Sequence, residues 1–166
     1  MRPAHLVASL LTILATPALA DEGRLALVAK LAAGLVDGGQ MTQGSLGAGD
    51  IRQLDAGAYE VTFKTATMKY LFDEPDTCIF TQHAQLGDDA SEARFHFDKV
   101  TSIDVRAQGK FDGLNATLLT FNGPDGVIEV MMGDKLVPQV PAFAFLLTSM
   151  TTEEFQAAAD EIQRVC

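Results

Sequence analysis

The chain has 166 residues, with 22 acidic and 12 basic side chains and a formal net charge of −10 at pH 7. This balance argues against nucleic acid and anionic membrane surfaces as partners, because both are bound by clustered lysine and arginine. A chain of this length is typical of one domain that can bury a core of its own.

The first twenty residues have the parts of a secretory signal peptide. Arg2 gives a positive start, residues 6–14 are mostly apolar, and Ala18 and Ala20 provide the small residues of a cleavage site. The apolar part is shorter than the roughly 20 residues that span a bilayer. We therefore predict a signal peptide over 1–20, a mature domain over 21–166 without a transmembrane segment, and a periplasmic or secreted location. An uncleaved anchor is the alternative, which the lack of a stop-transfer pattern disfavours.

Cys78 and Cys166 are the only two cysteines, and both follow the leader. In an oxidising compartment two cysteines most simply pair, which predicts a disulfide between residue 166 and the middle of the chain. Two unpaired thiols are the alternative. The chain has no Cys-x-x-Cys motif, so thiol–disulfide catalysis is not expected.

The mature chain begins with a predicted helix over residues 23–36. Leu25, Val28 and Leu31 recur at three- and four-residue spacing and place apolar side chains on one face. Residues 38–50 are rich in glycine, which predicts a flexible loop.

From Tyr59 onward the apolar residues alternate with polar ones, which is typical of half-buried strands. The pattern predicts about seven short strands between residues 59 and 147. Turns are expected at residues 73–76 and at 122–126, where proline, aspartate and glycine cluster.

A second helix is predicted from Thr151, because Thr151 and Glu154 have the spacing of a capping box. The order of elements indicates an α+β domain. We expect an N-terminal helix, about seven mostly antiparallel strands in a curved sheet or partial barrel, and a C-terminal helix packed on it.

His83 and His96 are the two histidines of the mature chain. If residues 78–86 and 93–99 form a hairpin that pairs Ala84 with Phe95, His83 lies opposite His96, and Asp98 lies nearby. These three residues would make a partial zinc or copper site. The alternative is a solvated strand face with two ordinary histidines.

Other motifs of catalysis or cofactor binding are absent from the sequence. The glycine-rich stretch lacks the lysine and hydroxyl of a phosphate loop, and the acidic turns lack the spacing of an EF-hand. We assign no catalytic residue and expect no cofactor.

These observations favour an exported, non-enzymatic binding or interaction module. A set of phenylalanines on the predicted strands indicates a well-filled core, and the alternative is a pocket in the curved sheet for a small apolar ligand. A protein partner is the other ligand class that we consider. Two alternatives belong to different classes. One is a small hydrolase or isomerase that uses His83 or His96 as a base, and the other is a structural component of the cell envelope.

Overall fold

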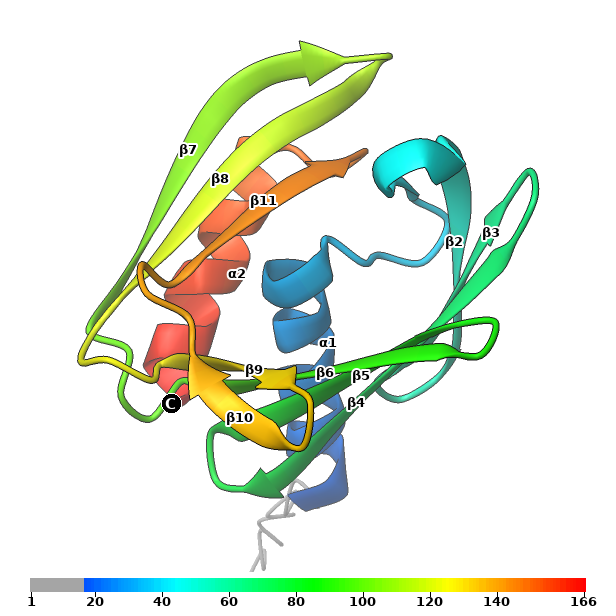
Figure 1. Ribbon diagram of the computed structural model, residues 1–166. Coiled ribbons are helices and arrows are strands. Elements are labelled where there is room, and N and C mark those ends of the chain that lie inside the picture. Colours follow the sequence, from blue (N-terminus) through cyan, green and yellow to red (C-terminus); the bar gives the residue numbers. More distant parts are fainter. Residues whose placement is uncertain (1–16) are drawn as a thin grey trace, which may run out of the picture.

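The structure is a computed structural model that describes residues 17–166. It is an α+β fold in which two helices lie inside the curve of one large antiparallel sheet (Figure 1). Residues 1–16 of the predicted signal peptide lie outside the described residues. Ala18 and Ala20 fall within helix α1 (Pro17–Ala33), so cleavage at this position stays a prediction.

The sheet has eleven strands, rather than the predicted seven, and it is not closed. Its strand order is β10-β9-β6-β5-β4-β3-β2-β1-β11-β8-β7. The strands are β1 (Gln40–Thr42), β2 (Ala48–Asp55), β3 (Ala58–Phe63), β4 (Thr67–Asp76), β5 (Ile79–Leu86), β6 (Asp89–His96), β7 (Ser102–Phe111), β8 (Leu114–Asn122), β9 (Ile128–Met132), β10 (Lys135–Pro138) and β11 (Phe143–Thr148).

The inner face of the sheet is filled by the two helices. Val28 and Leu31 of α1 are fully buried, as are Phe155 and Ile162 of helix α2 (Thr152–Val165). Beside them, four phenylalanines of β5, β6, the turn after β6 and β8 pack ring against ring with centroids 5.8–6.4 Å apart. These phenylalanines therefore fill the core inside the curve, as the first interpretation of them predicted, rather than lining a cavity there.

Helix α2 confirms two predictions. Its capping box is formed, with the backbone nitrogen of Glu154 donating to Thr151 Oγ1 and that of Thr151 donating to the Glu154 carboxylate. The disulfide between Cys78 and Cys166 is present and fastens the end of α2 to the turn between β4 and β5. This turn lies at Thr77–Cys78, because β4 continues through residues 73–76, where a turn was predicted.

The structure corrects the predicted loop over residues 38–50. This segment contains β1, a short 3-10 helix η1 (Gly44–Leu46) and the start of β2. The alternation that marks a strand is hidden because Gly49 occupies an inward position of β2. A Cβ there would lie 2.6 Å from the ring of Phe63, which fills that space instead. Such close approach of a neighbour is one reason for glycine inside a strand.

The predicted register of the β5–β6 hairpin is wrong by four residues. Phe80 pairs with Phe95 and His83 pairs with Glu92, because a two-residue turn at Gly87–Asp88 joins the strands directly after Leu86. Gly87 has φ of 60°, the conformation that tight hairpin turns require at their first position. An even shift preserves which face each residue occupies, but it changes every cross-strand partner.

Candidate functional site

The outer face of the sheet, away from the helices, carries a row of side chains that crosses five strands. Ala58, Leu71, His83 and Glu92 are consecutive partners on β3, β4, β5 and β6. The pairing of Ala93 with Val130 brings Met131 of β9 next to Glu92 in the same row. Since neighbouring strands lie about 4.8 Å apart, the row is about 19 Å long.

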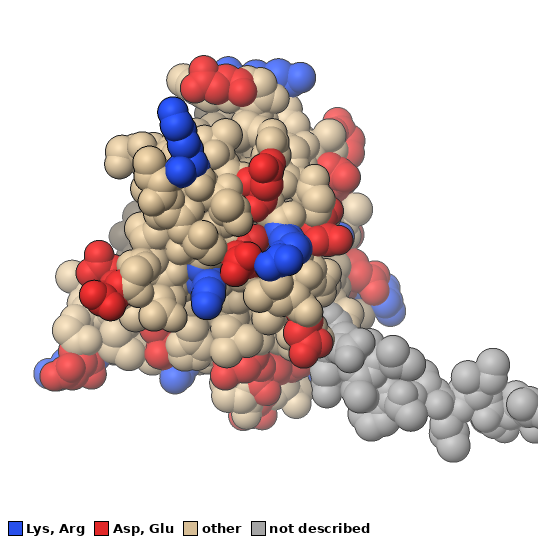
Figure 2. Space-filling model, turned by 90° about the vertical axis from the view of Figure 1, so that its right-hand side faces the viewer, with Lys and Arg blue, Asp and Glu red and all other residues tan. Residues whose placement is uncertain are grey.

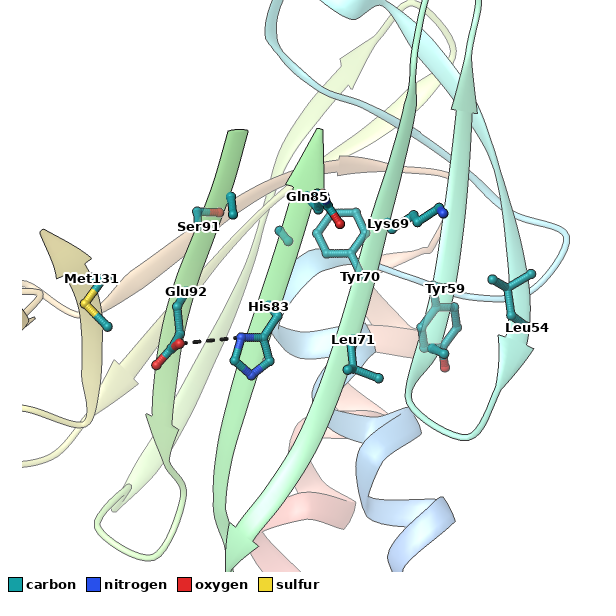
Figure 3. A pocket seen from close by; sticks show the side chains of 13 residues that line it. Leu54, Tyr59, Lys69, Tyr70, Leu71, His83, Gln85, Ser91, Glu92 and Met131 are labelled. Atoms are coloured by element: carbon teal, nitrogen blue, oxygen red, sulfur yellow. Dashed lines mark ion pairs between the residues drawn. The ribbon is translucent and has the colours of Figure 1, made fainter. Parts of the chain in front are cut away.

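A hollow of about 650 Å³ lies over this row. Its apolar side chains include Leu54 at the end of β2, Leu71 in the middle and Met131 on β9 (Figure 3). Leu54 and Leu71 are half exposed, so a sizeable apolar surface is left open to solvent here. The polar members of its lining are Lys69, His83, Gln85, Ser91 and Glu92.

His83 stands between two carboxylates in the hollow. Its Nδ1 lies 3.5 Å from Glu92 Oε2, and its Nε2 lies 3.9 Å from Asp73 Oδ2. Figure 3 shows the imidazole directed toward Glu92. Among residues 23–166, His83 makes no hydrogen bond to a serine or threonine hydroxyl, and the contacts of its two ring nitrogens are with carboxylates.

His96 lies on the same outer face but outside the hollow. It pairs with Ile79, and it is four residues, or about 13 Å, along β6 from Glu92. Its Nε2 lies 3.0 Å from Glu129 Oε2, while its buried Nδ1 has no hydrogen bond and lies 3.8 Å from Asp98.

The candidate metal ligands His83, His96 and Asp98 are thus not brought together. His96 and Asp98 are neighbours, and His83 belongs to a different group of side chains. In the described part of the chain, no three histidine, cysteine, aspartate or glutamate side chains are grouped so that they could hold a metal ion.

Tyr59 and Tyr70 form the floor of the hollow, with side chains that are almost completely buried on the inner side of the sheet. Burial raises the pKa of Tyr70 to about 12. Burial, and to a smaller extent the carboxylate of Asp37, also raises the pKa of Tyr59. Both phenols are therefore neutral near pH 7, and neither adds a charge beneath the hollow.

Charged groups of both signs surround the site. On the face beside β2 and β3, acidic and basic side chains are interspersed, without a continuous basic patch (Figure 2). Arg52 and Glu60, on this outer face, form one exposed pair with a distance of 2.9 Å. This distribution does not favour a polyanion.

The apolar part of the hollow was missed at the level of sequence, although one signal was present. Leu71 lies between Tyr70 and Phe72, at a position where strict alternation calls for a polar residue. The contribution of Met131 depends on β9 lying beside β6, and no local pattern indicates that long-range pairing.

Among residues 17–166, no helix combines the length and the apolar character that crossing a membrane requires. Comparison of the chain with protein-family models, with curated proteins and with solved structures finds no match.

Proposed function

We propose that this chain is an exported, non-enzymatic binding protein that holds a small, mainly apolar molecule in the hollow over β3–β6 and β9. The observation that carries the proposal is the exposure of Leu54, Leu71 and Met131 around one concavity, at 51%, 50% and 37%. Apolar side chains gathered in a concave site are removed from water when a ligand covers them, and this burial drives binding. The disulfide agrees with an oxidising compartment outside the cytoplasm.

The size of the hollow favours a small molecule over a folded protein partner. Ligand sites of small molecules have volumes of about 300–1,000 Å³, a range that includes this one. A stable protein interface buries about 800 Å² of surface on each partner. This area is larger than the surface of a hollow about 19 Å long. The His83–Glu92 pair at its centre would orient a polar group of the ligand.

The test is a fluorescence titration of the purified mature protein with the neutral apolar dye N-phenyl-1-naphthylamine. We expect saturable binding with one site. Leu71→Ser and Met131→Ser should each weaken binding at least tenfold, because they place a hydroxyl where an apolar contact was. Met132→Ser is the matched control, since Met132 is also exposed but does not line the hollow, and its affinity should stay within twofold of wild type.

Two results would contradict the proposal. One is the absence of saturable binding, which would favour the structural role in the envelope. The other is equal weakening by Met131→Ser and Met132→Ser, because the dye would then be bound elsewhere on the surface.

A second candidate function is general-base catalysis, favoured by the contact of His83 with Glu92 inside the hollow. Hydrolysis of an activated ester such as p-nitrophenyl butyrate would support it if the rate fell at least a hundredfold in His83→Ala and stayed unchanged in His96→Ala. Equal rates in all three proteins would exclude His83 as the base.

A further inference from the structure

We propose that Arg94 binds an anionic group of the ligand, so that the molecule held on the outer face is an amphipathic carboxylate or a similar anion. This inference rests on the proposed function and adds to it the chemical class of the ligand.

Arg94 lies on the outer face of the sheet, on β6, and no side chain among residues 23–166 forms a hydrogen bond or an ion pair with its guanidinium. It is paired in register with Thr81 of β5 and with Glu129 of β9. The residue is partly buried, and its Nε is shielded from solvent without an acceptor. Nowhere in residues 23–166, whose side chains the structure describes, does a carboxylate come within ion-pair distance of its guanidinium.

This isolation is unusual in a chain with almost twice as many acidic as basic side chains. Arg24, Arg52 and Arg164 each contact a glutamate. Arg106 contacts none, but it is exposed on β7 and is solvated by water. Among the arginines with described side chains, Arg94 therefore differs in being partly buried with a shielded donor, Nε, that has no acceptor.

The acids nearest to Arg94 in the sheet are directed to the two histidines. Glu129, its partner on β9, lies against His96, and Glu92, two residues away on β6, lies against His83. Neither carboxylate is therefore within ion-pair distance of the guanidinium. A buried donor without an acceptor is costly, and a carboxylate of a ligand would relieve that cost with two parallel hydrogen bonds.

The position of Arg94 fits one end of a molecule lying in the hollow. Glu92 and Met131 line the hollow, and Arg94 is about 7 Å along β6 from Glu92, on the same face. A ligand whose apolar body covers Leu71 and Met131 can place a polar end over Arg94. An apolar body with an anionic end is the composition that both features require.

The test compares three ligands with the same ten-carbon chain and different head groups, used below their critical micelle concentrations. Decanoate, decyltrimethylammonium and decyl maltoside are titrated against the complex with N-phenyl-1-naphthylamine. In the wild-type protein, decanoate should compete at least tenfold better than decyltrimethylammonium. Arg94→Gln should weaken decanoate about tenfold to a hundredfold and leave decyl maltoside within twofold, as expected for the loss of a charged hydrogen bond.

Arg106→Gln is the control, because it removes the same charge from a distant exposed position; it should leave the affinity for all three ligands unchanged. Equal competition by decanoate and decyltrimethylammonium in the wild-type protein would overturn the inference, and this comparison needs no variant. An equal loss of affinity for decanoate and decyl maltoside in Arg94→Gln would also overturn it, since Arg94 would then act only through the structure of the sheet. A protein that does not bind the dye at all contradicts the proposed function instead.

Discussion

The two faces of strands β3–β6 differ in kind, although alternate residues of the same strands form both. On the inner face, Tyr70, Phe72 and Phe80 are almost fully buried against the helices and the aromatic cluster. On the outer face, Leu71 and His83 are about half exposed. Residues of the inner face are held in place by packing, whereas residues of the outer face contribute little to the core. Substitutions on the inner face should therefore lower stability, and those on the outer face should lower ligand affinity.

The largest loss of stability is expected when the disulfide that joins helix α2 to the sheet is removed. Replacing both Cys78 and Cys166 by serine opens a loop with a sequence separation of 88 residues. In the chain-entropy model this lowers the free energy of unfolding by about 4–5 kcal/mol. Urea unfolding followed by circular dichroism measures the change. In the folded variant, dye affinity should stay within twofold, and a tenfold loss would mean that the two faces are not independent.

Two adjacent residues of β4 allow the most direct comparison of substitutions on the inner and the outer face. Phe72 is 1% exposed and Leu71 is 50% exposed. Phe72→Ala should lower the free energy of unfolding by about 3–5 kcal/mol, because it leaves a cavity in the core. Leu71→Ala should change it by less than about 0.5 kcal/mol. Similar losses in the two variants, measured by urea unfolding, would contradict the division into a structural and a binding face.

The same alternation explains how far the sequence could predict the fold. It places both histidines on the outer face, and the structure agrees. It leaves the register open, because any even shift of β6 along β5 satisfies the pattern equally well. The two-residue turn at Gly87–Asp88 decides between these shifts, because it fixes Leu86 opposite Asp89.

Elements that rest on local chemistry were predicted well, and those that rest on distant partners were not. The capping box at Thr151 and the pairing of the only two cysteines need no knowledge of strand order. Strand β2 was not predicted, because its inward position 49 is a glycine and the space of its side chain is filled by the ring of Phe63. The hollow was not predicted for a related reason. It needs β9 beside β6, a pairing that crosses two intervening strands in the sequence.

The smallest of the three effects on stability concerns Tyr70, whose side chain is buried on the inner face beneath the hollow. Its pKa is about 10 in the unfolded chain and about 12 in the native protein. Because the native state holds the proton more tightly, this contribution to stability is present in full below pH 10. It is lost as the pH rises toward 12. In Tyr70→Phe that loss is absent.

Between pH 9 and pH 11.5, the wild-type protein should therefore lose about 2 kcal/mol of stability relative to Tyr70→Phe, with urea unfolding as the measurement. The chain has two tyrosines and no tryptophan, so the phenolate absorbance near 295 nm reports these groups directly. If Tyr70 instead ionised near pH 10 in the native protein, the floor would be open to water. The side chain would then be hydrated on the inner face, and that face would not be the sealed structural side that the comparison of the two faces requires.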